Sequence, residues 1–357
     1  MNIQMGSGRN AASWAGTMIV CLLLAACGGG GGGGEDIPDD GGGGSGESAY
    51  SFTLDEENAV DVLSMALILG ELVKGLGSDE SVFWWVYSAL PGLTPGQAYQ
   101  VPIDDVPCES AGMTIKLNDN DGDEEASSGD TVDVYNISDC YDSSFRWYLT
   151  STDSAENPGV VITVNSMTGR MDDDYALDLF IEFRNLQIEM IAGPNFTVNG
   201  MQRADIEFSF SLETDQGSYE TRFSGAALSI EGSAPLRDFS GDMDFALTLR
   251  DYSHVFSTGY DGTYLPYSWR FDGLVDISDV SDGTDRYAGT LNLETLQAFS
   301  GEQLSNPSSG RLKLTGQNSS VSLIAIGDEQ VRLELDLGDD GSVDAAETVF
   351  WSDVINL

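Results

Sequence analysis

Apolar and polar residues alternate along much of the chain from about residue 110 onward. The alternation is clearest over 177–183, 206–213 and 331–337, where Leu, Ile, Phe or Val at every second position is separated by charged residues or serines. Short turn sequences containing Asp and Gly separate the runs, for example at 215–217 and 281–283. A period of two residues is typical of antiparallel strands with one buried and one solvated face. The pattern therefore predicts about a dozen strands in a mainly β fold: a large antiparallel meander, a curved sheet or a barrel-like sheet.

Two very apolar segments before the strands favour helices, at 53–76 and 80–90. Thr53 and Glu56 have the spacing of a capping box, which would open the first helix. Val60, Leu63 and Leu67 then recur close to helical spacing. These helices are expected to pack on the sheet; the alternative is that they plug or gate a hydrophobic cavity. The predicted organisation is a helical segment at 50–95 and an antiparallel β domain at 96–357.

The N-terminus has the anatomy of an export signal. Arg9 is the only charged residue before Cys27, and 14–26 is apolar apart from Thr17 and small residues. This stretch is too short for a membrane-spanning helix, which needs about 20 apolar residues. It ends in Leu24-Ala25-Ala26-Cys27-Gly28. We therefore expect a signal peptide at 1–26. An ordinary cleaved signal with a chance cysteine, or a short anchor helix, is the alternative.

The Leu-Ala-Ala-Cys-Gly sequence resembles the lipobox of bacterial lipoproteins. That resemblance implies cleavage before Cys27, a diacylglyceryl thioether on its sulfur and an acylated amine, which together anchor a protein to a membrane. Gly28 after the cysteine implies the outer membrane under the enteric sorting rule, with either a periplasmic or a surface orientation. The glycine-rich stretch at 27–49 cannot bury apolar surface, so it is expected to be a flexible tether with a reach of about 25 Å.

The charge of the chain is extreme, with 59 Asp and Glu against 15 Lys and Arg and a formal net charge of −44. Such a field repels nucleic acids and anionic membrane surfaces. The acid-rich, lysine-poor composition is typical of proteins from salty environments, and an acidic surface for a basic partner is the alternative. The protein or ligand partner is not identified by the sequence.

The cysteines indicate one disulfide bond. Of the four cysteines in the sequence, Cys21 lies in the signal and Cys27 would carry lipid. Cys108 and Cys140 remain, and an envelope compartment is oxidising, so these two are expected to pair. Metal ligation or a redox pair is the alternative, but there is no C-x-x-C spacing and no histidine nearby.

Two acidic loops are candidate calcium sites. In 119–130, a twelve-residue reading places oxygen ligands at Asp119, Asp121, Asp123, Glu125 (through its carbonyl), Ser127 and Asp130. This loop resembles those of dockerin-type EF-hands, although Glu124 replaces the glycine expected at its sixth position and a strand follows it. In 336–347, the candidate ligands are Asp336, Asp340, Asp344 and Glu347, with Gly338 at a position that should supply an oxygen. Both loops could instead be solvated acidic turns.

The C-terminal segment at 307–351 resembles the ending of a group of uncharacterised proteobacterial lipoproteins. The likeness rests on Pro307–Gly310, Val331–Asp336, Asp340-Gly341, Val343–Ala345 and Trp351, together with the first acidic loop. It implies no known activity.

The sequence contains few motifs typical of catalytic sites, so an enzyme is not favoured. The single histidine, His254, has no Gly-x-Ser-x-Gly motif to accompany it. The sequence therefore favours an outer-membrane-anchored lipoprotein with a non-enzymatic binding or envelope-structural role and calcium as the only candidate cofactor. One alternative is a periplasmic carrier of an apolar ligand. Another is a carbohydrate-binding or carbohydrate-active protein using Trp147, Trp269 or Trp351 as sugar platforms.

Overall fold

The structure is a computed structural model. It describes residues 50–76, 84–101, 112–142, 147–151, 153–169, 174–190, 195–211, 216–235, 242–260, 266–280, 288–302 and 305–354. The predicted signal peptide and tether at 1–49, including Cys27, lie outside the described residues.

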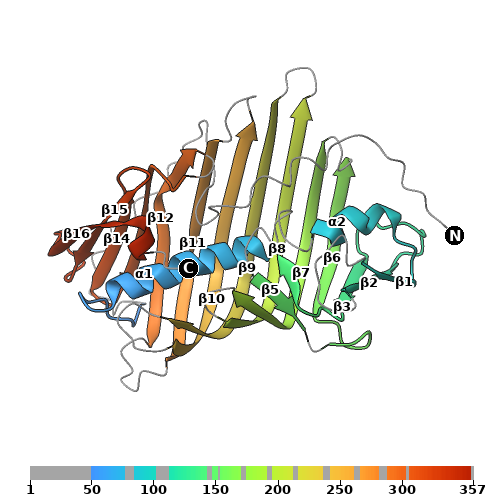
Figure 1. Cartoon of the computed structure of the whole chain (residues 1–357), viewed down its shortest axis with the longest axis horizontal. Coiled ribbons are helices and arrows are strands. Elements are labelled where there is room, and N and C mark those ends of the chain that lie inside the picture. The colour runs from blue at the N-terminus through green and yellow to red at the C-terminus, as the bar shows by residue number, and fades with distance from the viewer. Residues whose placement is uncertain are drawn as a thin grey trace, which may run out of the picture.

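The described residues form one open, curved antiparallel sheet with few helices, which confirms the predicted fold class. The 16-stranded sheet has the order β1-β2-β3-β6-β7 and then continues strand by strand to β16 (Figure 1). The hairpin of β4 and β5 leaves this path, and β5 pairs with the second half of β7. The strands are β1 (Ala98–Gln100), β2 (Thr114–Asn118), β3 (Thr131–Tyr135), β4 (Cys140–Asp142), β5 (Trp147–Thr150), β6 (Val160–Gly169), β7 (Tyr175–Met190), β8 (Asn195–Ser211), β9 (Gln216–Pro235), β10 (Asp242–Tyr260), β11 (Pro266–Val280), β12 (Gly289–Glu302), β13 (Ser309–Gly316), β14 (Ser319–Ala325), β15 (Gln330–Asp336) and β16 (Ala345–Phe350).

The central strands are interrupted by register shifts at corresponding positions. These shifts lie between Phe183 and Leu186 in β7, Met201 and Arg203 in β8, Arg250 and Ser253 in β10, and Trp269 and Gly273 in β11. A β-bulge bends its strand and increases the local twist. Because the shifts occur in neighbouring strands, they bend the whole sheet along one line rather than a single strand.

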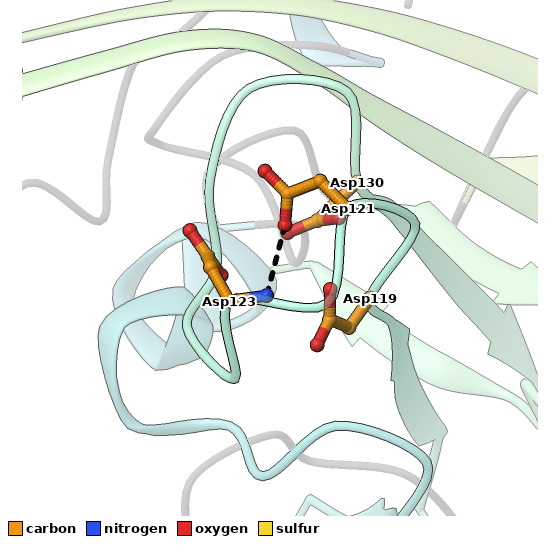
Figure 2. Close-up of side chains that lie close together, drawn as sticks. All are labelled: Asp119, Asp121, Asp123 and Asp130. Carbon is orange, nitrogen blue, oxygen red and sulfur yellow. Dashed lines mark hydrogen bonds between the residues drawn. The ribbon is translucent and has the colours of Figure 1, made fainter.

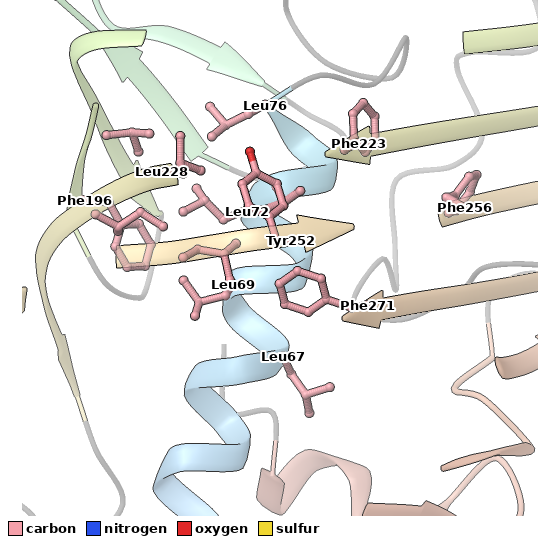
Figure 3. Close-up of a cluster of buried hydrophobic side chains, with 14 of the residues drawn as sticks. Leu67, Leu69, Leu72, Leu76, Phe196, Phe223, Leu228, Tyr252, Phe256 and Phe271 are labelled. Atoms are coloured by element: carbon pink, nitrogen blue, oxygen red, sulfur yellow. The ribbon is translucent and has the colours of Figure 1, made fainter. Parts of the chain in front are cut away.

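Helix α1 (Ala59–Gly75) lies across the strands on one face of the sheet (Figure 1). Apolar residues occur all round this helix, and 13 of its 17 residues are buried, as expected for a helix enclosed on most sides. Figure 3 shows its leucines between two parts of the sheet, with Phe196 and Leu228 on one side and Phe223, Phe256 and Phe271 on the other. The bent sheet and α1 therefore share one hydrophobic core.

The first helix begins later than the sequence pattern indicated. It starts at Ala59, and Asn58 is its N-cap residue, so the prediction that Thr53 opens a helix is wrong. The segment before α1 instead lies along the sheet: the N–H of Phe52 donates to the carbonyl oxygen of Thr290, and the N–H of Leu54 donates to the hydroxyl of Ser319. Backbone groups committed to the sheet cannot form a helical turn at the same time.

Of the second predicted helix, at 80–90, the described part is helical. Helix α2 (Trp84–Ala89) is followed by a 3₁₀ turn at Leu90–Gly92, while 77–83 lie outside the described residues. A third helix, α3 (Trp351–Val354), ends the described chain and contacts α1 through the bond from the Ser64 hydroxyl to the carbonyl oxygen of Val354. Within the part of the chain that the structure describes, every helix falls short of the length and apolar character that a membrane crossing requires.

Candidate metal centre

The first acidic loop connects β2 to β3. The last residue pair of this hairpin is Asn118 with Thr131, so 119–130 form the connection. The loop is tied to the next strand of the sheet as well, because the N–H of Gly129 donates to the carbonyl oxygen of Val164 and the N–H of Val164 donates to that of Asp130. Ordered strands thus fix the base of the loop.

Four carboxylates converge in this loop. Each of Asp119, Asp121, Asp123 and Asp130 offers an oxygen atom, and these atoms all lie within 4.8 Å of one another (Figure 2). Three of them come from alternating positions at the start of the loop, and the fourth comes from its last residue. Within the described residues, this is the one group of three or more acidic, histidine or cysteine side chains with such a spacing.

Hydrogen bonds from the loop backbone hold these carboxylates in place. Asp119 accepts from the N–H groups of Gly122 and Glu124, and Asp121 accepts from the N–H of Asp123 at 3.1 Å. Asp123 in turn accepts from the N–H of Glu125 at 2.9 Å. Each bond closes a short turn, so the backbone coils around the space between the carboxylates.

Asp130 fixes the other end of the loop. Its side chain is fully buried, one oxygen accepts from the N–H of Asn120 at 2.8 Å, and the other accepts from the N–H of Ser127 at 2.9 Å. The Ser127 hydroxyl also donates to Asp121 at 3.2 Å. A buried carboxylate that accepts two backbone hydrogen bonds keeps the two ends of the loop together, which orders the site before any ion arrives.

Glu124 adopts the conformation that a glycine would normally supply. Its φ is 67°, in the left-handed region that side chains with a Cβ rarely occupy. The loop therefore makes the sharp turn of a calcium loop at its sixth position even without the expected glycine. The substitution strains the backbone but does not prevent the carboxylates from converging.

The electrostatics of the loop suit a cation. The backbone N–H of Gly122, aided by that of Glu124, lowers the pKa of Asp119 and so keeps this carboxylate ionised. Close like charges repel, and a divalent cation between them would replace that repulsion with attraction. Carboxylate oxygens in a flexible loop are the ligands that Ca²⁺ prefers. Of the other predicted ligands, Ser127 is engaged with Asp121 and Glu125 is exposed.

The second acidic loop has a different structure. Asp336 at the end of β15 accepts backbone hydrogen bonds from Gly338, Asp340 and Gly341, which makes a capped turn between β15 and β16. Asp344 accepts from the N–H of Leu337, and Glu347 lies exposed on β16 opposite Leu333. Lys313 forms an ion pair with Asp339 at 3.0 Å. The structure does not bring the predicted ligands of this loop together.

The two cysteines predicted to pair are described only in part. Cys140 lies on β4 and is fully buried, whereas Cys108 lies outside the described residues. The bond between them stays a prediction.

His254 and the tryptophans lie in the core. His254 is 2% exposed on the inner face of β10, and burial, with a smaller contribution from the charge of Lys74, lowers its pKa to about 3. Trp147, Trp269 and Trp351 are 2%, 6% and 2% exposed, and Trp269 stacks on Phe299 at 4.2 Å between ring centroids. The hypothesis that these tryptophans are sugar platforms is therefore wrong, because their faces already pack against core residues.

The structure also reveals a surface hollow that sequence reasoning missed. An open hollow of about 900 Å³ lies at the ends of β6–β11, and it combines hydroxyl, carboxylate and aromatic side chains with one arginine. Its described lining includes Thr168, Asp174, Tyr175, Glu207, Phe208, Ser209, Ser218, Tyr219, Glu220, Arg222, Ser257, Thr258 and Ser268. Because these residues come from six strands spread over 168–268, no linear motif marks the hollow.

Comparisons with known proteins do not assign the chain to a family. No family model, no curated protein and no solved structure matches it. The converging carboxylates of Asp119, Asp121, Asp123 and Asp130 are therefore the strongest indication of chemistry in the described residues.

Proposed function

We propose that the protein is a lipid-anchored component of the bacterial cell envelope, with a non-enzymatic binding or structural role, that takes up calcium in the loop between β2 and β3. The observation that carries the calcium part is the convergence of four aspartate oxygens within 4.8 Å. The lipobox at Cys27 supports the anchor, and Gly28 after it favours the outer membrane.

Calcium would act on the stability of one part of the sheet. The loop joins β2 and β3, and β1, at one edge of the sheet, pairs with β2. A cation shared by Asp119, Asp121, Asp123 and Asp130 would neutralise their mutual repulsion and strengthen the bend of the loop. The backbone hydrogen bonds that already shape the loop lower the ordering cost of binding. Calcium binding would therefore stabilise this hairpin and the short strand beside it.

The apolar-carrier alternative receives little support from the interior. A carrier needs a pocket of several hundred Å³ for its ligand. Between α1 and the sheet, the described residues surround a cavity of only about 10 Å³. The side chains of α1 and the sheet fill the interior instead, and this favours a structural role for α1.

Binding of a polar ligand such as a carbohydrate is the second candidate function. Its site would be the hollow at the strand ends and not the tryptophans considered in the sequence analysis. The observation that favours it is the hollow of about 900 Å³ at the strand ends. Hydroxyl groups and carboxylates there can bond sugar hydroxyls, and Tyr175 and Phe208 stack at 5.4 Å beside them. Filling the hollow with Ser257→Trp should abolish binding of neutral oligosaccharides, whereas Ser229→Trp, on an exposed site of β9 outside the hollow, should not.

Calcium binding can be tested by calorimetry and thermal unfolding of the mature chain. Calcium at one hundred times its dissociation constant should stabilise the fold by about 2.7 kcal/mol. Asp121→Asn combined with Asp123→Asn should remove most of this gain, because asparagine keeps the turn-forming oxygen and loses the charge. The matched control is Asp340→Asn with Asp344→Asn in the second loop, which should keep the gain.

General screening of the net charge would also stabilise the fold, so magnesium and sodium at matched ionic strength are required controls. If sodium alone reproduces the effect, or the double variant of the first loop retains it, the loop is only an acidic turn.

The anchor is tested separately: Cys27→Ser should release the protein from the membrane fraction or leave the signal uncleaved, and unchanged fractionation would contradict the lipobox.

A further inference from the structure

The last strand of the sheet has an open edge. Among the described strands, β16 pairs with β15 alone, and it lies at the left end of the sheet in Figure 1. An edge strand presents N–H and C=O groups that another strand can bond, and prolines, lysines or a very short length usually protect it. At the opposite end of the sheet, β1 has only three residues, whereas β16 has six and contains neither proline nor lysine. β16 is therefore the longer and less protected of the two described sheet edges.

The hydrogen bonds between β15 and β16 show which backbone groups point outward. The N–H of Trp351, which directly follows β16, donates to the carbonyl oxygen of Glu329 at 3.1 Å. Along an antiparallel pair, residues that bond the neighbouring strand alternate with residues that do not. The residues of β16 that bond β15 are therefore every second one before Trp351. In this register the N–H and C=O groups of Ala346 and Thr348 point away from β15, toward the open edge.

Exposed apolar side chains gather around this edge. Of the eight large hydrophobic side chains that are exposed among the described residues, four lie in or next to β14, β15 and β16: Ile326, Leu337, Val343 and Phe350. Phe350, on β16 itself, is 52% exposed. Single exposed apolar side chains are normal, whereas a group of them marks an interaction site. The surface around β16 is therefore suited to contact with another chain.

The strands near this edge also differ in charge from the centre of the sheet. Each strand from β7 to β12 carries more acidic than basic residues. The strands β13 to β16 together carry three basic and three acidic residues, namely Arg311, Lys313, Arg332, Glu334, Asp336 and Glu347. A second copy of this chain has the same large negative charge, so repulsion opposes its approach least at these strands. A strongly basic partner would instead find more attraction at the acidic central strands.

We infer that β16 pairs with β16 of a second copy of this chain, in antiparallel orientation, about a two-fold axis at Thr348. In this register Ala346 lies opposite Phe350 of the partner subunit, which covers the exposed ring. Glu347 lies opposite Val349 of the partner subunit, so no like charges face each other directly. An axis at Glu347 would instead place the two carboxylates opposite each other, which is destabilising.

The pairing uses the backbone groups that point outward. Thr348 exchanges two hydrogen bonds with Thr348 of the partner subunit, and the N–H of Ala346 donates to the carbonyl oxygen of Phe350 of the partner subunit. The N–H of Phe350 keeps its present partner, the Asp353 carboxylate, at 3.1 Å. Main-chain bonds of this kind supply the affinity when a strand is added to a sheet edge. A two-fold contact uses each edge once, so the assembly closes as a dimer.

Sedimentation equilibrium of the mature chain tests the pairing, with Cys27→Ser so that the chain carries no lipid. We expect a reversible equilibrium between monomer and dimer, because a contact of six residues from each copy is small. Raising sodium chloride from about 0.15 M to about 1 M should favour the dimer, because it shortens the range of the repulsion between the two copies. A protein that stays monomeric at both salt concentrations overturns the inference, even if β16 binds an extended peptide of another protein. Growth into species larger than a dimer overturns it as well.

Thr348→Pro provides the sharpest variant. Proline removes the N–H that points away from β15, so it should block the pairing and leave the bonds between β15 and β16 intact. The loss of this bond from both copies should raise the dissociation constant of the dimer by about tenfold or more. The matched control, Thr348→Val, keeps the N–H and should dimerise as the parent does. A folded Thr348→Pro protein that dimerises as strongly as the parent contradicts the pairing.

A charge exchange at the axis gives a second test, which decides if the proline variant does not fold. Thr348→Lys and Thr348→Glu each place like charges opposite each other, so each variant alone should dimerise less than the parent. An equal mixture of the two variants should form the dimer again, because a lysine then faces a glutamate. A mixture that dimerises no better than either variant alone overturns the inference.

Discussion

Gln202 of β8 and Val73 of α1 are joined across the interface between sheet and helix. Nε2 of Gln202 donates to the carbonyl oxygen of Val73 at 3.1 Å, and Oε1 of the same side chain accepts from the hydroxyl of Tyr252 at 3.2 Å. Val73 lies in the last turn of α1, where carbonyl groups lack partners within the helix. One buried amide therefore satisfies a helix end and a tyrosine of the sheet together.

Replacing Gln202 with leucine should destabilise the fold. The substitution leaves the Val73 carbonyl and the Tyr252 hydroxyl buried without this partner, which costs about 1–3 kcal/mol for each unsatisfied group. Urea unfolding would measure the loss. Tyr252→Phe in the Gln202→Leu background should cost less than in the parent, because the hydroxyl has already lost its partner. Equal costs in both backgrounds would show that the two residues act independently.

Glu124→Gly should stabilise the loop between β2 and β3. Glu124 has a φ of 67°, and a left-handed conformation costs a residue with a Cβ roughly 1–2 kcal/mol. Removing the side chain relieves that cost and also removes one negative charge, so Glu124→Gln serves as the control for charge. We expect a gain of about 1 kcal/mol over Glu124→Gln in thermal unfolding without calcium. Gly122→Ala, at a φ of 82°, should have the opposite effect.

The alternation of apolar residues predicted the sheet but underestimated the length of its strands. In β10, the buried positions Leu247 and Leu249 are followed by Tyr252 and His254, so the pattern changes phase at Asp251. The register shift there, with Asp251 at a φ of 46°, continues the strand through the change of phase. A bulge shifts the apolar positions along the strand, so a search for strict alternation ends at the bulge. Such a search therefore predicts two short strands where the structure has one long bent strand.

Contacts between distant strands were equally hidden. Gly225 and Gly273 lie within β9 and β11. In the structure, they flank Tyr252 from the two neighbouring strands, and a Cβ atom on Gly225 or Gly273 would come within 2.7 or 2.9 Å of the Tyr252 side chain. The need for glycine is thus set by a side chain on a third strand, which no local pattern reports.

The two acidic loops show what local sequence can and cannot predict. Asp119, Asp121 and Asp123 alternate along the chain, and alternation alone was enough to predict that they converge. In the second loop, Gly338 interrupts the alternation, and Asp336 caps the turn instead. The ion pair of Lys313 with Asp339 could not be foreseen, because it depends on β13 lying near that turn.

The free energy of unfolding should decrease as the pH is lowered, because His254 is buried without a proton. The pKa of this imidazole is lowered from 6.5 to about 3 by burial and by Lys74. Below pH 6.5 the unfolded chain therefore binds a proton that the folded chain does not, and the stability that is present above pH 6.5 is lost as the pH falls toward 3. The loss approaches about 1.4 kcal/mol per pH unit for one proton. Because carboxylates also titrate in acid, the measurement is the difference in unfolding free energy between the parent and His254→Gln from pH 7 to pH 4. A difference that does not change with pH would contradict the lowered pKa.

Cys108 and Cys140 should be bonded in the mature protein. Thiol labelling of denatured, unreduced chain should find neither sulfur free, and Cys140→Ser should expose one reactive thiol at Cys108. Closing the loop between them is expected to stabilise the fold by about 3–4 kcal/mol in the chain-entropy model. Stoichiometric labelling of both cysteines in the parent would disprove the bond.

The position of the segment before α1 has a consequence for the order of folding. Phe52 bonds Thr290 and Gln317, Leu54 bonds Ser319, and Ser64 bonds Val354. The beginning of the folded chain thus finds its partners near the end, at sequence separations of 265 residues for Leu54 with Ser319 and 290 residues for Ser64 with Val354, and such contacts are strongly non-local. A ribosome releases the N-terminal part first, so the apolar residues of α1 stay uncovered until the strands that pack against it, among them β10 and β14, have been made. During that interval the helix would be a natural target for chaperones.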